Sequence, residues 1–268
     1  MAESDRPCVL IISGNDPSGG AGMAADIQTV SALGGHPAPV LTSLTVQDTA
    51  NAYRVSPVDP GLVTEQAATV LADLPIRAVK IGLLATVEIG SAVASLLGDH
   101  GHLPVVLDPV LVAAGGADLA EQALEEVIVE QLLPLATVVT PNALELVRLA
   151  GSRAADRESR ARALLSRGCD WVLAKGADED TVGVENMLYG KAGFVESFRW
   201  TRLPGHYHGS GCTLAAALAT MIAKSVPIPR AAADAQRYTD FALRNAFCPG
   251  RGQNIPGRMA AAGDLPGS

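Results

Sequence analysis

The chain has 268 residues, a hydrophobic fraction of 48%, an aromatic fraction of 4% and a formal net charge of −8. This length can bury a substantial core, which the small aromatic fraction leaves to Ala, Val, Leu and Ile. The negative charge and the lack of a basic run argue against nucleic acid and acidic membrane surfaces as partners. No signal-peptide pattern is present and the four cysteines form no CxxC pair, so we expect a cytoplasmic protein without a disulfide framework.

Short apolar runs alternate with helical segments along the chain. Strands are predicted at 9–14, 39–47, 78–82, 105–108, 137–141 and 171–176, and helices at about 22–33, after Pro60, at 86–98 and between the later strands. Near-continuous apolar strands joined by helices are typical of a parallel sheet covered on both faces.

The C-terminal third departs from this rhythm. Segment 187–200 predicts an antiparallel hairpin at the sheet edge, and two helices at about 211–224 and 228–246 follow it. The last residues are rich in Gly, Pro and Ala and predict a flexible tail over about 257–268. Because the sequence contains neither a repeat nor a linker, we expect residues 1–268 to form a single domain.

The unusual polar and glycine-rich segments all follow predicted strands. They are GNDPSGGAG at 14–22, QD at 47–48, GLL at 82–84, DPV at 108–110, TPN at 140–142 and KG at 175–176. In open parallel sheets, ligands bind beyond the carboxyl ends of the strands. The six coincidences therefore predict one ligand site along this edge.

The first glycine-rich segment allows three interpretations. Gly20-x-Gly22-x-x-Ala25 resembles a dinucleotide fingerprint, although residues 15–19 separate it from the strand. The segment could instead be a plain turn with Asp26 in solvent, or a loop that walls a small-molecule pocket with Asp26 pointing inward.

TPNALE at 140–145 places Asn142 and Glu145 on one face of a predicted helix. These oxygen ligands could hold a hydrated Mg²⁺. Alternatively, they could form a capping box at the helix start. From these residues alone, capping is the favoured interpretation.

GSGCT at 209–213 is the strongest local motif. Its glycines let backbone amides converge where a helix begins, and helix N-termini bind anions. The same field predicts a lowered pKa for the thiol of Cys212, which could take a proton from a substrate hydroxyl during phosphoryl transfer. Two alternatives are a close-packed helix start in which Cys212 merely fits, and a zinc site with His206 and His208 that lacks an evident fourth ligand.

Taken together and in order, these motifs resemble a known family. SGNDPSGGAGMAAD, LTVQDT, VKIGLL, VLDPVLVA, TPNALE and HGSGCT, within about 9–256, are similar to those of the hydroxymethylpyrimidine kinase/phosphomethylpyrimidine kinase family of thiamine biosynthesis. That family belongs to the ribokinase-like superfamily. The resemblance implies a three-layer α/β/α fold with a mostly parallel central sheet and an edge hairpin. No insertion between 49 and 71 is long enough for a large lid.

The resemblance further implies ATP- and Mg²⁺-dependent phosphorylation of 4-amino-5-hydroxymethyl-2-methylpyrimidine to its monophosphate and then its diphosphate, by a homodimer. The residues it implies for the substrate are Gly14, Asp26, Gln47, Leu83 and Val110, with Asp26 and Gln47 hydrogen-bonded to the aminopyrimidine. Those implied for nucleotide and metal are Lys175 at the phosphates, and Asn142 and Glu145 at Mg²⁺ through water. Gly209, Ser210 and Gly211 would form an anion hole, with Cys212 as the base.

Several positions depart from the family pattern and leave alternatives open. Ala114-Gly115 stands where relatives often have Lys-Ser, Ala177-Asp178 where many have Gly-His, and Leu83 where Met is common. Nucleotide preference and the second phosphorylation are therefore open. The alternatives are a pyridoxal/pyridoxine kinase on the same fold, a dinucleotide-binding oxidoreductase and a non-catalytic vitamin-precursor-binding protein.

Overall fold

The computed structural model describes residues 6–111, 122–151, 154–177, 179 and 181–259. A nine-stranded sheet runs through them in the order β3-β2-β1-β4-β5-β6-β7-β8-β9. The strands are β1 (Cys8–Asn15), β2 (His36–Gln47), β3 (Ala52–Pro57), β4 (Ile76–Ile81), β5 (Val105–Leu107), β6 (Val138–Val139), β7 (Trp171–Ala174), β8 (Gly183–Gly190) and β9 (Gly193–Thr201). The departures at 114–115 and at 178 lie outside the described residues.

Eight α-helices lie in the described part of the chain. They are α1 (Gly22–Ala32), α2 (Pro60–Asp73), α3 (Val87–Gly98), α4 (Gln122–Val127), α5 (Ala143–Ala150), α6 (Arg157–Ser166), α7 (Ser210–Ala223) and α8 (Ile228–Arg244). A π-helical turn (Ile128–Leu132) and a 3-10 turn (Leu133–Leu135) continue α4. None of the helices described is long and apolar enough to cross a membrane.

The central strands are parallel and the edges are antiparallel. β2, β1, β4, β5, β6 and β7 pair in parallel. The predicted hairpin at one edge is confirmed as β8 and β9. At the other edge, β3 pairs antiparallel with β2 and was not predicted. Its sequence AYRVSP is half-buried or exposed, so it lacks the continuous apolar pattern of the central strands.

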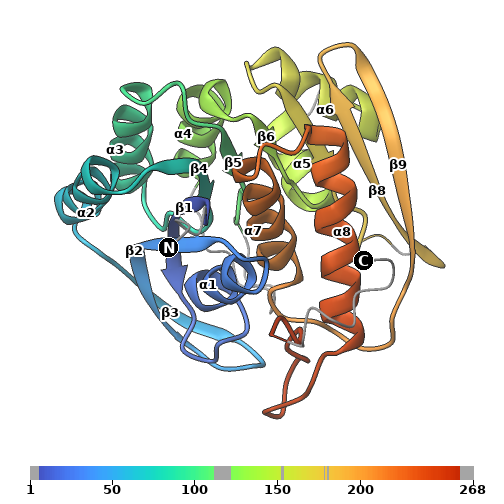
Figure 1. Cartoon of the computed structure of the whole chain (residues 1–268). Coiled ribbons are helices and arrows are strands. Elements are labelled where there is room, and N and C mark those ends of the chain that lie inside the picture. The colour runs from blue at the N-terminus through green and yellow to red at the C-terminus, as the bar shows by residue number, and fades with distance from the viewer. Residues whose placement is uncertain (1–5, 112–121, 152–153, 178, 180, 260–268) are drawn as a thin grey trace.

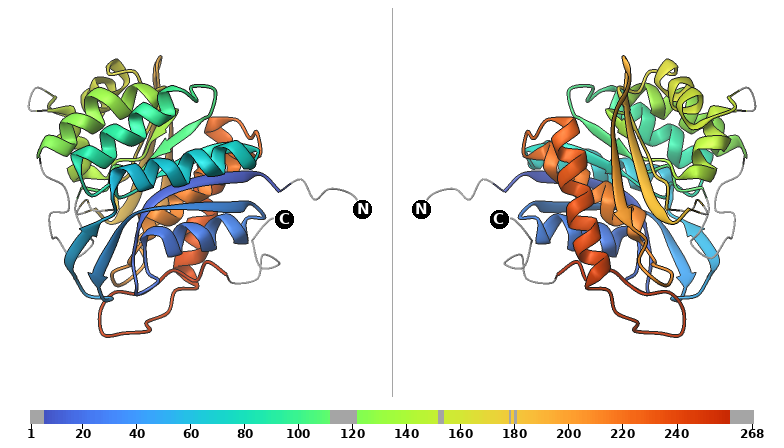
Figure 2. Two further views of the ribbon diagram at one scale, coloured as in Figure 1. Left: turned by 90° about the vertical axis from the view of Figure 1, so that its left-hand side faces the viewer. Right: turned by 90° about the vertical axis from the view of Figure 1, so that its right-hand side faces the viewer.

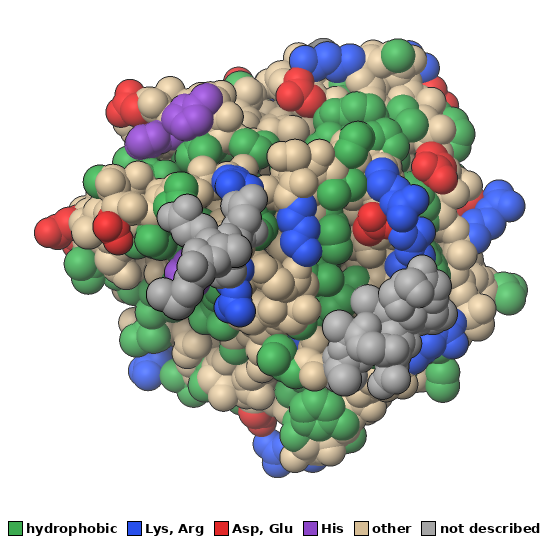
Figure 3. Space-filling model, viewed as in Figure 1, with side chains coloured by type: hydrophobic (Ala, Val, Ile, Leu, Met, Phe, Trp, Pro, Cys, Tyr) green, Lys and Arg blue, Asp and Glu red, His purple; other side chains and the backbone are tan. Residues whose placement is uncertain are grey.

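The sheet lies between two layers of helices (Figure 1), which Figure 2 shows from the sides. Successive β1 residues face opposite layers: Leu10 and Ile12 pack in the core beneath α2 to α6, whereas Val9 and Ile11 pack in the core beneath α1, α7 and α8. Basic, acidic and apolar side chains are scattered over the face shown in Figure 3.

Arg258 anchors the C-terminal segment inside the fold. Its side chain is buried, with Nε donating to Oγ1 of Thr213 at 2.8 Å. Its guanidinium also donates to the backbone oxygens of Gly20 and Gly209. It therefore joins the glycine-rich loop after β1 to the turn before α7. The prediction of a flexible tail from residue 257 is wrong for Arg258, and residues 260–268 lie outside the described residues.

Candidate active site

A cavity of about 1140 Å³ opens along the carboxyl ends of the parallel strands, as the order of the motifs predicts. The first turn of α7 forms part of its wall. Eleven of the twelve predicted site residues line it: Gly14, Gln47, Leu83, Val110, Asn142, Glu145, Lys175, Gly209, Ser210, Gly211 and Cys212. The structure thus brings together residues from six different strand ends and one helix start.

Asp26 is the exception and does not line the cavity. It lies on the inner face of α1, where Oδ2 accepts from Nζ of Lys80 at 2.7 Å, and neither side chain is exposed. Burial opposes the charge on Lys80, but the carboxylate of Asp26 and its neighbours hold the pKa of Lys80 above its ordinary value. Asp26, which was expected to accept a hydrogen bond from the substrate, thus forms a buried ion pair and does not line the cavity. Sequence reasoning missed Lys80, because its partner lies 54 residues away.

The turn before α7 holds the residues that the sequence predicts to form an anion hole. Gly209 is the N-cap residue with φ +80°, and a Cβ there would lie 2.0 Å from the backbone oxygen of Gly20. Only glycine fits this close approach. The first-turn amides of α7 have no intrahelical acceptor, and they form the positive end of the helix dipole.

Cys212 begins this helix as a thiol rather than a thiolate. Burial raises its pKa to about 11, although the nearby ammonium of Lys80 and the backbone N–H of Gly22 act in the opposite direction. The predicted lowering of the pKa is therefore wrong. The loss of solvent around the sulfur outweighs the contacts that favour the thiolate.

Lys175 lies beside the turn before α7 in a chain of charged groups. Its Nζ donates to Oδ1 of Asp108 at 2.9 Å and lies 4.0 Å from Oε2 of Glu145. A Cβ on Gly211 would lie 3.1 Å from Nζ, so the ammonium is next to the turn. Burial would raise the pKa of Asp108, but Lys175 and Lys80 hold it below its ordinary value. Asp108 also lines the cavity and was missed, although DPV marks the end of β5.

Asn142 and Glu145 form the capping box that starts α5. Oδ1 of Asn142 accepts from the backbone N–H of Glu145 at 2.8 Å, and Oε2 of Glu145 accepts from that of Asn142 at 2.7 Å. The capping interpretation is thus confirmed, while both side chains also line the cavity. Among the described residues, no three or more His, Cys, Asp or Glu side chains are grouped to hold a metal, so the zinc alternative at His206, His208 and Cys212 finds no support.

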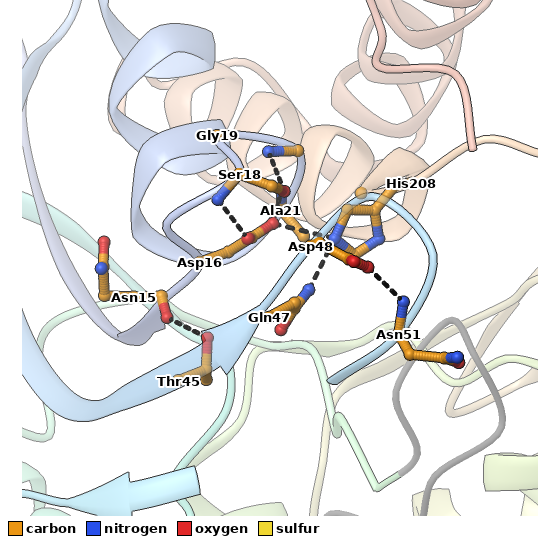
Figure 4. A network of polar contacts seen from close by, with 12 residues as sticks. Asn15, Asp16, Ser18, Gly19, Ala21, Thr45, Gln47, Asp48, Asn51 and His208 are labelled. Carbon is orange, nitrogen blue, oxygen red and sulfur yellow. Dashed lines mark hydrogen bonds and ion pairs between the residues drawn. The ribbon is translucent and has the colours of Figure 1, made fainter. Parts of the chain in front are cut away.

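A second polar network, shown in Figure 4, also lines the cavity with Asp16, Gln47 and His208. Asp16 accepts from the backbone N–H groups of Ser18 and Ala21 at 2.8 and 2.7 Å, and its Oδ2 lies 2.8 Å from Nε2 of His208. Burial acts to raise the pKa of Asp16, but the hydrogen bonds from His208 and Ser18 hold it below its ordinary value. Gln47 reaches the same imidazole from the end of β2. This network was not predicted, because the sequence separates its members by up to 192 residues.

A glycine-rich helix start beside a lysine and carboxylates, at the carboxyl edge of a parallel sheet, is consistent with a kinase of the ribokinase-like fold. The solved pyridoxal kinase of Staphylococcus aureus in complex with AMP-PCP and pyridoxal matches with a TM-score of 0.85 and 27% identity over 96% of this chain and 95% of that chain. The chain belongs to the phosphomethylpyrimidine kinase family, whose model matches residues 16–257.

Two curated relatives agree with this assignment. The hydroxymethylpyrimidine/phosphomethylpyrimidine kinase of Synechococcus elongatus is 40% identical over 94% of this chain and 97% of its own. The thiamine biosynthesis bifunctional protein ThiED of Geobacter sulfurreducens is 39% identical over 97% of this chain, which spans only 54% of that longer protein.

Proposed function

We propose that this protein is an ATP-dependent kinase that phosphorylates 4-amino-5-hydroxymethyl-2-methylpyrimidine to its monophosphate and then to the diphosphate, in thiamine biosynthesis. One observation carries the proposal: the polar side chain of Gln47 and the helix start at 209–212 line the same cavity. An aminopyrimidine bound at the first would direct its hydroxymethyl group toward the second. The whole described chain would act as one kinase domain.

In the first step, the hydroxyl oxygen attacks the γ-phosphorus of ATP, the bond to the bridging oxygen breaks and ADP leaves. Gly209, Ser210 and Gly211 offer backbone amides to the transferring phosphoryl group, and Lys175 adds a positive charge beside them. The minor fraction of Cys212 that is already a thiolate, which Lys80 and the amide of Gly22 stabilise, takes the hydroxyl proton and becomes a thiol. Gly14, Leu83 and Val110 enclose the ring.

Mg²⁺ would neutralise charge on the nucleotide phosphates when bound. Carboxylate and amide oxygens are ligands that this ion accepts, often through water, and Asn142 and Glu145 present such oxygens to the cavity. Their capping hydrogen bonds keep both side chains in place at the start of α5. The donor set therefore fits a hydrated Mg²⁺.

The second step makes a smaller demand on the protein. The attacking group is a phosphate that is already ionised at neutral pH, so it needs little help from a base. We therefore expect Cys212→Ala to slow the first step far more than the second. Cys169→Ala is the matched control, since that buried thiol does not line the cavity.

A pyridoxal kinase activity is the second candidate, because the fold of a pyridoxal kinase matches closely. The deciding experiment offers hydroxymethylpyrimidine, its monophosphate and pyridoxal separately, with ATP and Mg²⁺, and resolves the products by mass. Mono- and diphosphate from the pyrimidine are expected. Turnover of pyridoxal alone would overturn the substrate, and no transfer to any of them would favour a binding protein.

A homodimer is the proposed assembly, and its surface would be the β2–β3 edge. Leu44, Val46 and Tyr53 are 52%, 46% and 60% exposed there. Apolar side chains gathered on a sheet edge favour association. Sedimentation of Val46→Glu should show a monomer, whereas an unchanged mass would move the contact elsewhere. The use of ATP and the four free cysteines support a cytoplasmic location.

A further inference from the structure

His208 holds two partners with one ring nitrogen. Its Nε2 lies 2.8 Å from Oδ2 of Asp16 and 2.7 Å from the amide nitrogen of Gln47. The side chains of His208 and Asp16 are 7% and 3% exposed, so water cannot easily replace either contact. Gln47 lies beside His208 in Figure 4, and it also lines the cavity.

A ring nitrogen carries either a proton or a lone pair, and this decides between the two partners. The carboxylate of Asp16 already accepts from two backbone N–H groups, and its pKa is lowered, so it is ionised at neutral pH. An ionised carboxylate can only accept. Nε2 of His208 must therefore carry the proton and donate it to Asp16.

The same proton excludes a hydrogen bond from the amino group of Gln47. Two donors facing each other at 2.7 Å repel, whereas a carbonyl oxygen in that place would share the proton of Nε2 with Asp16. The oxygen and nitrogen of a side-chain amide exchange places by a half-turn, with no other movement. The charge on Asp16 thus selects one of two amide orientations.

We propose that the Asp16–His208 pair is a specificity-determining unit: it turns the carbonyl oxygen of Gln47 toward His208 and the amino group of Gln47 toward the cavity. The wall then offers a hydrogen-bond donor, which suits a substrate ring with a nitrogen lone pair at that place. The exocyclic amine of the substrate is not what Gln47 recognises. This assignment rests on the proposed function for its substrate, but not for the orientation itself.

The orientation is tested first in the free protein, by ¹⁵N NMR of the imidazole nitrogens. The His208→Gln spectrum, which lacks one ring, assigns the signals. We expect a proton on Nε2 of His208 at neutral pH. A proton on Nδ1 with bare Nε2 would overturn the proposal. Since no substrate is present, this result is independent of whether the pyrimidine is the true substrate.

The consequence for binding is tested with hydroxymethylpyrimidine and its 4-deamino analogue, which keeps the ring nitrogens. His208→Leu releases the amide, and KM for hydroxymethylpyrimidine should rise about tenfold with kcat little changed, because one oriented hydrogen bond is lost. His208→Gln, which retains an N–H donor at the position of Nε2, should restore most of the affinity. KM for the 4-deamino analogue should rise by a similar factor in His208→Leu, because the lost hydrogen bond goes to a ring nitrogen that both substrates contain. An unchanged KM for both substrates would show that the pair has no part in specificity, and a rise for hydroxymethylpyrimidine alone would show that Gln47 recognises the exocyclic amine.

Discussion

The first phosphorylation should depend on pH through Cys212, and the second should not. The pKa of the thiol is about 11, so at about pH 7 roughly one molecule in 10⁴ carries the thiolate, and this fraction grows about tenfold per pH unit. If the thiolate is the base, kcat/KM of the first step should rise about 100-fold between about pH 7 and about pH 9. The second step uses a phosphate that is already ionised and should stay flat.

The assay follows mono- and diphosphate by mass across this range, starting from each acceptor in turn. Cys212→Ala should lower the first rate and abolish its slope, while Cys169→Ala should keep both. The stability of the folded protein sets the upper limit of the usable pH range. The folded-state pKa of Cys212 lies above the ordinary thiol value of 9.0, so the stabilisation is complete below about pH 9 and is lost as the pH rises through about 11. A flat first-step profile, or the same slope without Cys212, would refute the base role.

Three further predictions concern the frame of the site. Lys80→Met leaves Asp26 unpaired in the core and should lower the free energy of unfolding in urea by about 3–5 kcal/mol, most of which the double variant with Asp26→Leu should recover. Arg258→Ala removes the hydrogen bonds between two loops and should cost about 2–4 kcal/mol in the same assay and raise KM for ATP; equal stability of both proteins would contradict the anchoring role. Gly209→Ala should reduce ATP turnover more than tenfold, because its Cβ meets a backbone oxygen at 2.0 Å, whereas Gly98→Ala, with nothing within 4 Å, should be neutral.

The sequence predicted the architecture where local pattern decides it. The apolar parallel strands, the hairpin of β8 and β9 and the start of α7 are visible in short windows, and the order of the motifs places them at one sheet edge. β3 was not predicted, because an exposed edge strand lacks the apolar pattern by which strands are recognised in a sequence. The capping box at Asn142 was also predictable, since its two members are three residues apart.

The charged interior of the site was not predictable in this way. The sequence predicted that Asp26 points into the pocket, because its ion-pair partner Lys80 lies 54 residues away in the chain. The pKa of Cys212 depends on burial, which no local pattern gives, and the helix dipole alone suggested the wrong direction. The sequence indicated His208 only as a metal ligand, because its partner Asp16 lies 192 residues away in the chain.

The hydrogen bond between Arg258 and Gly20 spans 238 residues and so links the first loop of the site to the last described segment. Contacts this distant in sequence close late during folding, because a long loop must be ordered before they form. During synthesis, the glycine-rich loop leaves the ribosome long before Arg258, which anchors it. A nascent chain therefore holds the parts of a phosphate site without their final geometry, and ATP turnover should begin only after Arg258 has been synthesised and has folded into place.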